Sequence, residues 1–269
     1  MAALLQLQLD KILIFTLVLT RMSGLVLSAP VFGTRDVPLN VRALFAFAMA
    51  ALVAPTQWHL PLEEPAGTLH FLIFVGAELL IGLTLGLGIT ILFSGLQVAG
   101  TMIGRVGGLA LSNVFDPTLR GEVSLHSQLL NYVTLAVFVA IGGHRMLVAA
   151  TLDTFSALPP GSGLIPVGLG EMATELVAQS FALGLRASAP IVTALLLSTL
   201  VLGIISRTLP QLNILAVGFG LNSMMTMLTM AVTIAAIAYL FQNQVEHVLD
   251  MMGAAIAGAT QRVASGLGP

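Results

Sequence analysis

The sequence has 269 residues, of which 57% are hydrophobic and 8% are charged, with a net charge of −2 and a mean hydropathy of +1.00. Soluble domains carry about 25% charged residues, so the composition excludes an ordinary soluble domain and indicates an integral membrane protein. The absence of cysteine excludes a disulfide framework. The near-neutral charge, with Lys11 as the single lysine, is unlike a nucleic-acid-binding surface.

Six strongly apolar zones follow one another, without the strict alternation of barrel strands, so we expect helices. A spanning helix needs about 20 residues. One zone is short for that and another is long enough for one very long helix or two broken ones. The sequence therefore predicts an all-α membrane protein with broken or hairpin helices. The first zone runs past the core of a signal peptide, so we expect no cleavable leader. The zones are 12–32, 43–54, 71–104, 125–141, 176–205 and 214–241.

Proline and glycine mark the breaks between these zones. Pro30, Gly33 and Pro38 close the first zone, and residues 55–65 form a polar connector. The densest turn cluster, residues 159–166, predicts an internal boundary between an N-terminal and a C-terminal part. Beyond the last zone, apolar residues at helical spacing predict an amphipathic tail helix. These tail residues are Val245, Val248, Leu249, Met252 and Ile256.

Three charged residues, Arg21, Glu78 and Arg186, lie inside the apolar zones. A charge at the centre of a spanning helix costs about 2.5–3.5 kcal/mol on the insertion scale, which the surrounding apolar residues offset. Each charge still requires a partner or water. Two alternatives remain open: ion pairs within a helix bundle formed by this chain, or contacts with neighbouring subunits.

Glycines recur at intervals of four residues, with Gly82 and Gly86 in one row and Gly100, Gly104 and Gly108 in another. Small residues at this spacing let helix backbones approach closely in lipid. The alternative is that glycine is simply frequent in membrane helices. Because two rows flank one zone, we predict close helix packing there.

The segment 105–121, RVGGLALSNVFDPTLRG, connects two apolar zones but is itself apolar and contains hinge-like glycines. A plain connector is expected to be short and polar. Asp116 and Pro117 predict a fixed turn, because proline sets its own φ and aspartate bonds to nearby backbone. The residues leave two interpretations open: an apolar gate, or a re-entrant or interfacial loop that only packs.

No catalytic constellation emerges from the sequence. It has no P-loop, no H-E-x-x-H zinc motif and no G-x-S-x-G elbow, so we expect neither enzyme activity nor a cofactor or metal. We interpret His126 and His144 as interfacial or core hydrogen-bonding residues. The methionine-rich segment 223–230 is interpreted as core filling in preference to an adaptable gasket.

An ordered set of short motifs carries a family resemblance. The motifs are RMSG (21–24), APVFG (29–33), VP (37–38), VR (41–42), Glu78 with Gly82 and Gly86, Gly100 through FDP (115–117), GGH (142–144), FSALP (155–159), RTLPQLNI (207–214) and GF (218–219). Together they resemble the FliR family of flagellar biosynthetic proteins, whose wider family includes the SctT/SpaR proteins of virulence type III secretion systems. The resemblance covers residues 13–249. After GF the family often continues with Pro and then Leu-Lys, whereas residues 220–222 here are GLN, so no role of that lysine is carried over.

The resemblance implies a component of the flagellar type III export gate in the bacterial cytoplasmic (inner) membrane, within the basal body. Such a component assembles with FliP and FliQ as a helical spiral around a pore for unfolded flagellar proteins. It also implies FlhB-like and FlhA-like partners. The single export-gate domain, residues 1–269, would then comprise a FliP-like half (1–158), a FliQ-like half (167–250) and a polar tail (251–269).

The resemblance also implies that the loop is a plug inside the pore. Apolar side chains would exclude water, a hydrophobic constriction being able to gate in this way. Glycines would let the loop fold aside, and an Asp-Pro turn would fix its shape. The implied plug residues are Gly107, Gly108, Leu111, Val114, Phe115, Asp116 and Pro117.

Polar residues within the apolar zones and at their ends are implied in intersubunit or other polar contacts. The charges inside the zones would meet neighbouring subunits or pore water. The turn around Pro210 would make polar contacts, with an FlhB-like protein as partner. The set comprises Arg21, Glu78, Arg186, Arg207, Pro210, Gln211 and Asn213.

Two other classes of protein remain open from the residues alone. A self-contained helical-bundle transporter of small molecules would place a midplane site at broken helices, and the short zone 43–54 and long zone 71–104 support it. A membrane-embedded enzyme would need clustered Asp, His or Ser residues at one membrane face, and the sequence has no such cluster. An export component without an energy-coupling motif must take its driving force from an ATPase or the proton gradient.

Overall fold

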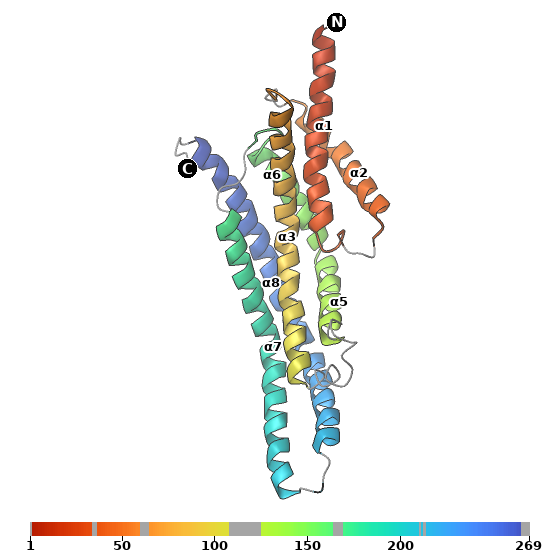
Figure 1. Cartoon of the computed structure of the whole chain (residues 1–269), viewed down its shortest axis with the longest axis vertical. Coiled ribbons are helices and arrows are strands. Elements are labelled where there is room, and N and C mark those ends of the chain that lie inside the picture. The colour runs from red at the N-terminus through yellow and green to blue at the C-terminus, as the bar shows by residue number, and fades with distance from the viewer. Residues whose placement is uncertain are drawn as a thin grey trace. The chain divides into compact units, whose positions relative to one another are not determined.

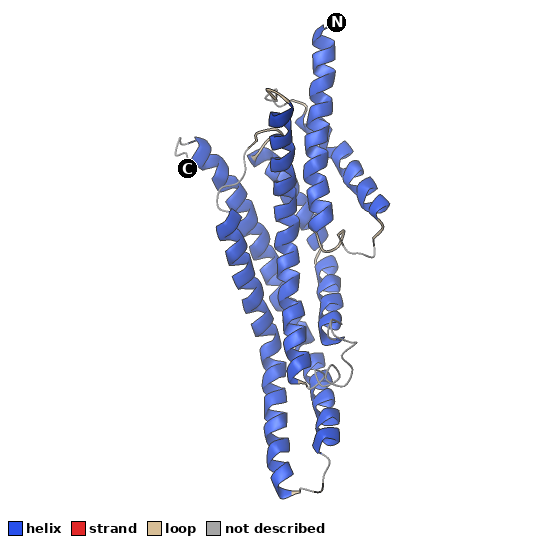
Figure 2. Cartoon of the chain, in the orientation of Figure 1, coloured by secondary structure: helices blue, strands red, loops and turns tan. Residues whose placement is uncertain are grey.

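The computed structural model describes residues 2–33, 37–59, 65–107, 125–163, 169–209, 211 and 214–264. These residues form seven α-helices and no strand (Figure 2), which confirms the predicted all-α class. The helices, labelled in Figure 1, are α1 (Ala2–Ser28), α2 (Leu39–Gln57), α3 (Thr68–Val106), α5 (Leu125–Ala140), α6 (Gly143–Ala157), α7 (Leu169–Thr208) and α8 (Ile214–Ala264).

Five of these helices, α1, α2, α3, α7 and α8, contain segments long and apolar enough to cross a membrane. The short helices α5 and α6 meet that criterion only as a pair, which would make a sixth, broken span. The break falls at Gly142, whose φ of 76° is in the left-handed region that glycine adopts without strain. The chain is therefore a helical integral membrane protein, and the bent pair α5–α6 has the composition of a broken span or a re-entrant loop.

Several helices run further than the apolar zones predict. The connector expected from residue 55 begins later, because Pro55 lies in the last turn of the 19-residue α2. Zone 71–104 forms one continuous helix of 39 residues. The tail is helical as predicted, but it is the end of the 51-residue α8 and no separate element. A change from apolar to mixed polarity does not end a helix where nothing interrupts its backbone hydrogen bonds.

The described helices divide into two compact units. Unit 1 draws its residues from Met1–Ile91, Gly142–Leu176 and Val245–Pro269, and unit 2 from Leu92–Ile141 and Val177–Gln244. Helices α3, α7 and α8 contribute residues to both. The predicted division into a FliP-like and a FliQ-like half is a different partition of the chain and stays a proposal.

The core of unit 1 begins with α1 packed on α2, which lie side by side in Figure 1. A buried cluster joins α1, α2 and α6, and Phe15 meets Phe47 edge to face at 5.5 Å. The five apolar tail positions of α8 are also buried in this unit, so its C-terminal end is part of the core. The α1–α2–α6 cluster is formed by Ile14, Val18, Met22, Ala50, Val53, Ala54 and Phe155.

Glycines bring α1 and α3 into backbone contact within unit 1. A Cβ atom added to Gly82 would overlap the carbonyl oxygen of Arg21, and one added to Gly86 would overlap Ser28. On the opposite side of the contact, a Cβ on Gly24 would lie 2.7 Å from the carbonyl oxygen of Leu79. The predicted glycine row 82–86 therefore lies where the two helix backbones touch.

Unit 2 uses glycine in the same way. A Cβ on Gly95 of α3 would overlap the Ser180 backbone of α7, and a Cβ on Gly184 would overlap the carbonyl oxygen of Gly95. Gly100 faces the backbone of Ser127 at the start of α5, whereas Gly104 is buried near the end of α3. The contact through Gly95 and Gly184 was not among the sequence predictions, because those glycines are on different helices and form no row.

We predict that Gly82→Ala destabilises the protein by about 1–3 kcal/mol, because the new methyl group has no room beside the α1 backbone. Gly76→Ala is the matched control on the same helix, since a Cβ there meets nothing within 4 Å. That control is expected to be neutral or stabilising by up to about 1 kcal/mol, from helix propensity. Thermal unfolding of both variants in one detergent measures the difference, and equal melting temperatures would contradict the close packing.

Candidate functional site

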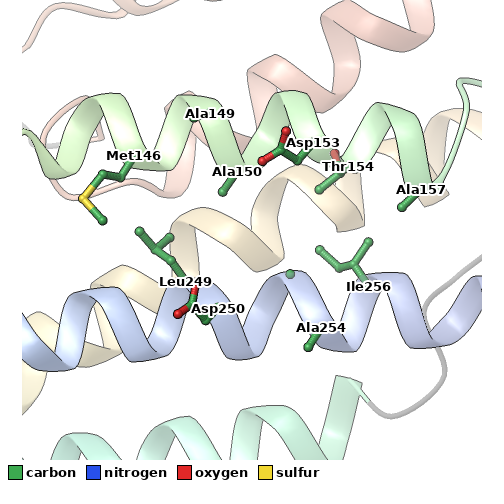
Figure 3. A pocket seen from close by; sticks show the side chains of 11 residues that line it. Met146, Ala149, Ala150, Asp153, Thr154, Ala157, Leu249, Asp250, Ala254 and Ile256 are labelled. Atoms are coloured by element: carbon green, nitrogen blue, oxygen red, sulfur yellow. The ribbon is translucent and has the colours of Figure 1, made fainter.

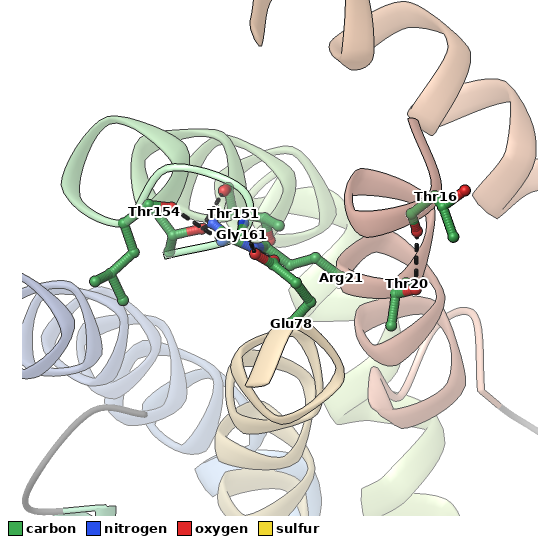
Figure 4. Close-up of polar contacts among 8 residues, drawn as sticks. Thr16, Thr20, Arg21, Glu78, Thr151, Thr154 and Gly161 are labelled. Carbon is green, nitrogen blue, oxygen red and sulfur yellow. Dashed lines mark hydrogen bonds and ion pairs between the residues drawn. The ribbon is translucent and has the colours of Figure 1, made fainter. Parts of the chain in front are cut away.

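The most elaborate polar arrangement in unit 1 is built around Arg21, which is fully buried in α1. Its Nε donates to Oε2 of Glu78 on α3 at 2.6 Å. Nη1 donates to the Thr154 hydroxyl at 3.0 Å (Figure 4). Nη2 donates to the carbonyl oxygen of Leu158 at 2.9 Å. Every nitrogen of the guanidinium group therefore has an acceptor, which a buried cation requires.

Glu78 is equally well satisfied, with 2% of its surface exposed. Its second carboxylate oxygen, Oε1, accepts the backbone N–H of Gly161 at 3.0 Å. Gly161 has a φ of 83°, which suits glycine, and this geometry lets the turn after α6 present its N–H to the carboxylate. The ion pair thus ties α1, α3, α6 and this turn together.

Phe155 connects the ion pair to the apolar core. The Arg21 guanidinium carbon lies 4.1 Å from the centroid of the Phe155 ring, a cation–π contact. The same ring belongs to the cluster that α1 and α2 bury. The Thr154 hydroxyl in turn donates to the carbonyl oxygen of Thr151 at 2.6 Å. We call Arg21, Glu78, Thr154, Phe155, Leu158 and Gly161 the Arg21 network.

The sequence left open whether Arg21 and Glu78 pair within the chain or with a neighbouring subunit, and in this structure they pair with each other. Arg186 differs, because it is exposed on α7 and forms no ion pair with a described residue. Arg207, in the last turn of α7, and Gln211 are exposed as well. Pro210 and Asn213 lie outside the described residues.

Only the first residue of the predicted plug lies within the described part of the chain. Gly107 is buried directly after α3, and its N–H donates to the Ile103 carbonyl oxygen at 2.8 Å. A Cβ on Gly107 would lie 3.5 Å from the hydroxyl of Thr226 on α8. The other plug residues, Gly108, Leu111, Val114, Phe115, Asp116 and Pro117, lie outside the described residues.

A polar contact between α7 and α8 lies one turn from Thr226. Ser198 donates to Oδ1 of Asn222 at 2.9 Å, and both residues are buried. The Thr226 hydroxyl donates to the Asn222 carbonyl oxygen at 2.7 Å. Asn222 is the last of residues 220–222, the segment GLN noted in the sequence analysis. Its side-chain amide makes a neutral hydrogen bond within unit 2.

Sequence reasoning missed Thr154, Phe155, Leu158 and Gly161 as members of a polar site. These residues lie more than 130 positions from Arg21, and neither a hydroxyl nor a backbone carbonyl or N–H group gives a local sequence signal. Residues 155–159 stood out in the sequence only for the family resemblance, and residues 159–166 only as a turn cluster. The available signal was the intramembrane charge itself, which demanded acceptors somewhere.

The fold and this network define a class: a helical integral membrane protein with a neutralised charge pair inside its helix packing. A family model described as bacterial export proteins, family 1, matches residues 12–248. The chain belongs to this family of bacterial export proteins, as the resemblance predicted.

Several curated relatives match most of the chain, and each is named flagellar biosynthetic protein FliR. The relative from Pectobacterium carotovorum subsp. carotovorum is 29% identical over 233 residues, covering 86% of this chain and 88% of the relative. The Bacillus subtilis (strain 168) protein is 29% identical over 242 residues, covering 88% and 92%. The Escherichia coli (strain K12) protein is 27% identical over 235 residues, covering 87% and 89%.

We predict that Arg21→Met or Glu78→Met alone lowers stability by about 3–5 kcal/mol, because each leaves an uncompensated buried charge. The double variant Arg21→Met/Glu78→Met removes both charges and should lose less than either single variant. Arg105→Met, at an exposed position near the end of α3, is the control and should change stability by no more than about 0.5 kcal/mol. A double-mutant cycle from thermal unfolding in detergent gives the coupling, and additive losses would exclude it.

Proposed function

We propose that this protein is a membrane component of the flagellar type III export gate, and that it assembles with FliP and FliQ around a pore for unfolded flagellar proteins. The single observation that carries the proposal is the export-family match over residues 12–248. The names of the relatives support the flagellar assignment. Helices long enough to cross a membrane support a place in the cytoplasmic membrane, within the basal body. In this role the chain is a channel component and no enzyme.

In this proposal the chain keeps the two halves that the resemblance implies. Residues 1–158 act as the FliP-like half and residues 167–250 as the FliQ-like half. The two long helices α7 and α8, joined by a short connection, support a second half built as a helical hairpin. The FlhA-like and FlhB-like export proteins are further partners in the proposal, the latter at the turn that carries Arg207 and Gln211.

Arg186 is the residue we propose for contact with a neighbouring subunit or with pore water. It is exposed on a helix that is otherwise apolar enough to span, next to exposed Leu185. A cation facing lipid there is costly, and no described residue of this chain forms an ion pair with it. An acidic side chain of a partner subunit, or water in the pore, would relieve that cost.

For residues 107–117 we propose the role of a plug that closes the pore. Leu111, Val114 and Phe115 supply the apolar surface, and a constriction of such residues gates by excluding water. Gly107 marks the start of the segment, and its fixed position beside Thr226 supports an anchored base. The neighbouring glycine, Gly108, then gives the loop its hinge.

Replacing Leu111, Val114 and Phe115 together by glycine is expected to increase ion leak through the assembled gate, because the apolar seal is lost while the backbone remains. Ion-sensitive growth or membrane conductance of cells that express the complex measures the leak. The matched control replaces exposed Leu196, Leu197 and Leu200 of α7 by alanine and should not leak. Normal assembly with an unchanged leak in the glycine variant would contradict the plug.

Co-expression of the tagged chain with FliP and FliQ, followed by native mass spectrometry in mild detergent, tests the assembly itself. We expect a defined hetero-oligomer that contains all three proteins and one fixed stoichiometry. A stable monomer or homodimer, with both partners expressed but unbound, would overturn the proposal and favour a self-contained transporter.

A further inference from the structure

A groove with a volume of about 510 Å³ runs between α6 and the C-terminal part of α8, within unit 1. Figure 3 shows the two helices side by side, with Asp153 on α6 and Asp250 on α8 among the side chains that line it. Nothing in the Arg21 network or the proposed plug accounts for this groove. Its α6 wall consists of Met146, Ala149, Ala150, Asp153, Thr154 and Ala157.

The spacing of the residues that line the groove indicates the shape of a partner that could bind there. The α6 wall repeats at intervals of three and four positions from Met146 to Ala157, which is one helix face about three turns long. The facing wall includes Gly253 and Ala254, so much of the lining is small. Small residues on a helix face let another helix backbone approach closely in lipid. A groove of this shape fits a third helix, in the manner of helix-in-groove recognition.

The two carboxylates define the charge of that helix. Asp153 and Asp250 are exposed, and neither forms an ion pair with a described residue. Asp250 lies in the mixed-polarity end of the candidate span Val217–Ile256, and Asp153 lies on α6, which meets the span criterion only together with α5. An unpaired carboxylate on a membrane helix favours a cationic partner. Arg21, which donates to Thr154 of the wall, is already neutralised by Glu78. Arg145, on the same helix, has its guanidinium group beside Gly142, close to the start of α6 and about three turns before its end.

The groove wall is held in a fixed position. Thr154 lines the groove next to Asp153 and accepts the hydrogen bond from Arg21. Phe155, the next residue, packs under the guanidinium group and into the core. On α8, Val248, Leu249 and Met252 are buried, which fixes the orientation of the helix that carries Asp250. The site therefore needs little reorganisation to bind a partner.

We propose that this groove binds a membrane helix of a partner subunit, with small residues against the alanine-rich wall and one Lys or Arg placed between Asp153 and Asp250. This inference deepens the proposed function, because it assigns one contact within the hetero-oligomer. The carboxylates select a basic helix and the small lining sets the distance of its backbone.

The first test combines Asp153→Asn and Asp250→Asn in the full chain, co-expressed with FliP and FliQ. The double variant should recover at least roughly tenfold less partner than the wild type, because the partner's cation loses both counter-charges. Glu246→Gln, an exposed carboxylate one turn before Asp250 that does not line the groove, is the matched control and should assemble normally. Thermal unfolding of the isolated double variant should match the wild type, which separates loss of binding from loss of folding.

If the double variant recovers as much partner as the wild type, the inference about the groove is wrong, while the proposed function is unaffected. If the wild-type chain itself recovers no partner, the proposed function fails first. If the isolated double variant is destabilised, the two carboxylates have a structural role inside the chain, and the inference is wrong. The same holds if Glu246→Gln impairs assembly as strongly as the double variant.

The second test uses the absence of native cysteine in the chain. Ala254→Cys places one thiol in the groove, and Leu152→Cys places one on α6 outside the lining residues. A membrane-permeant maleimide should label both thiols in the isolated chain, but only Cys at position 152 should stay reactive in the purified hetero-oligomer. Equal labelling at position 254 with and without partners would show that no helix fills the groove, and a lipid or detergent would then be its occupant.

Discussion

The structure of unit 1 depends on the requirement that a charge buried in an apolar helix bundle must have its partners within reach. Arg21 meets this requirement with a carboxylate, a hydroxyl, a carbonyl oxygen and an aromatic face, all from this chain. The partners come from two helices, α3 and α6, and from the turn after α6, so satisfying one side chain of α1 fixes the relative positions of four segments. Removing either charge leaves the other unpaired, which is why such pairs organise a structure even where they add little net stability.

The ion pair and the glycine contact between α1 and α3 belong together. Glu78 and Gly82 are four residues apart and therefore lie on the same face of α3. The side chain of Arg21 bonds to Glu78, while the carbonyl oxygen of Arg21 lies where Gly82 has no side chain. Without the glycine, the two helices would stand further apart and the 2.6 Å ion pair would stretch. A backbone property of one residue thus sets the strength of a side-chain contact one turn away.

The sequence predicted the helices better than their partners. Apolar runs and proline or glycine breaks located six of the seven described helices, because burial and backbone breaks leave local patterns in the sequence. Helix α6, Gly143–Ala157, was missed, because it is less apolar than the six predicted zones. The ends differed where polarity changed without a helix breaker, as in α8. Arg21 and Glu78 stood out as buried charges, but nothing local distinguished a partner within the chain from one on another subunit. Thr154 and Gly161 contribute through a hydroxyl and a backbone N–H, which leave no pattern, and most of the plug segment stays a prediction from family resemblance.

Five charged residues of this chain fall into two groups, and the division bears on how the protein works with others. Arg21 and Glu78 neutralise each other inside unit 1 and leave no demand on a neighbour. Asp153, Asp250 and Arg186 are exposed, Asp250 in the amphipathic end of α8, and none of them forms an ion pair with a described residue. Where such a charge faces lipid, a monomer would bear its cost continuously. In a subunit of a larger assembly, the same residues give specificity, because only neighbours of opposite charge relieve that cost. The internal pair holds the fold, and the exposed charges favour its incorporation into a complex.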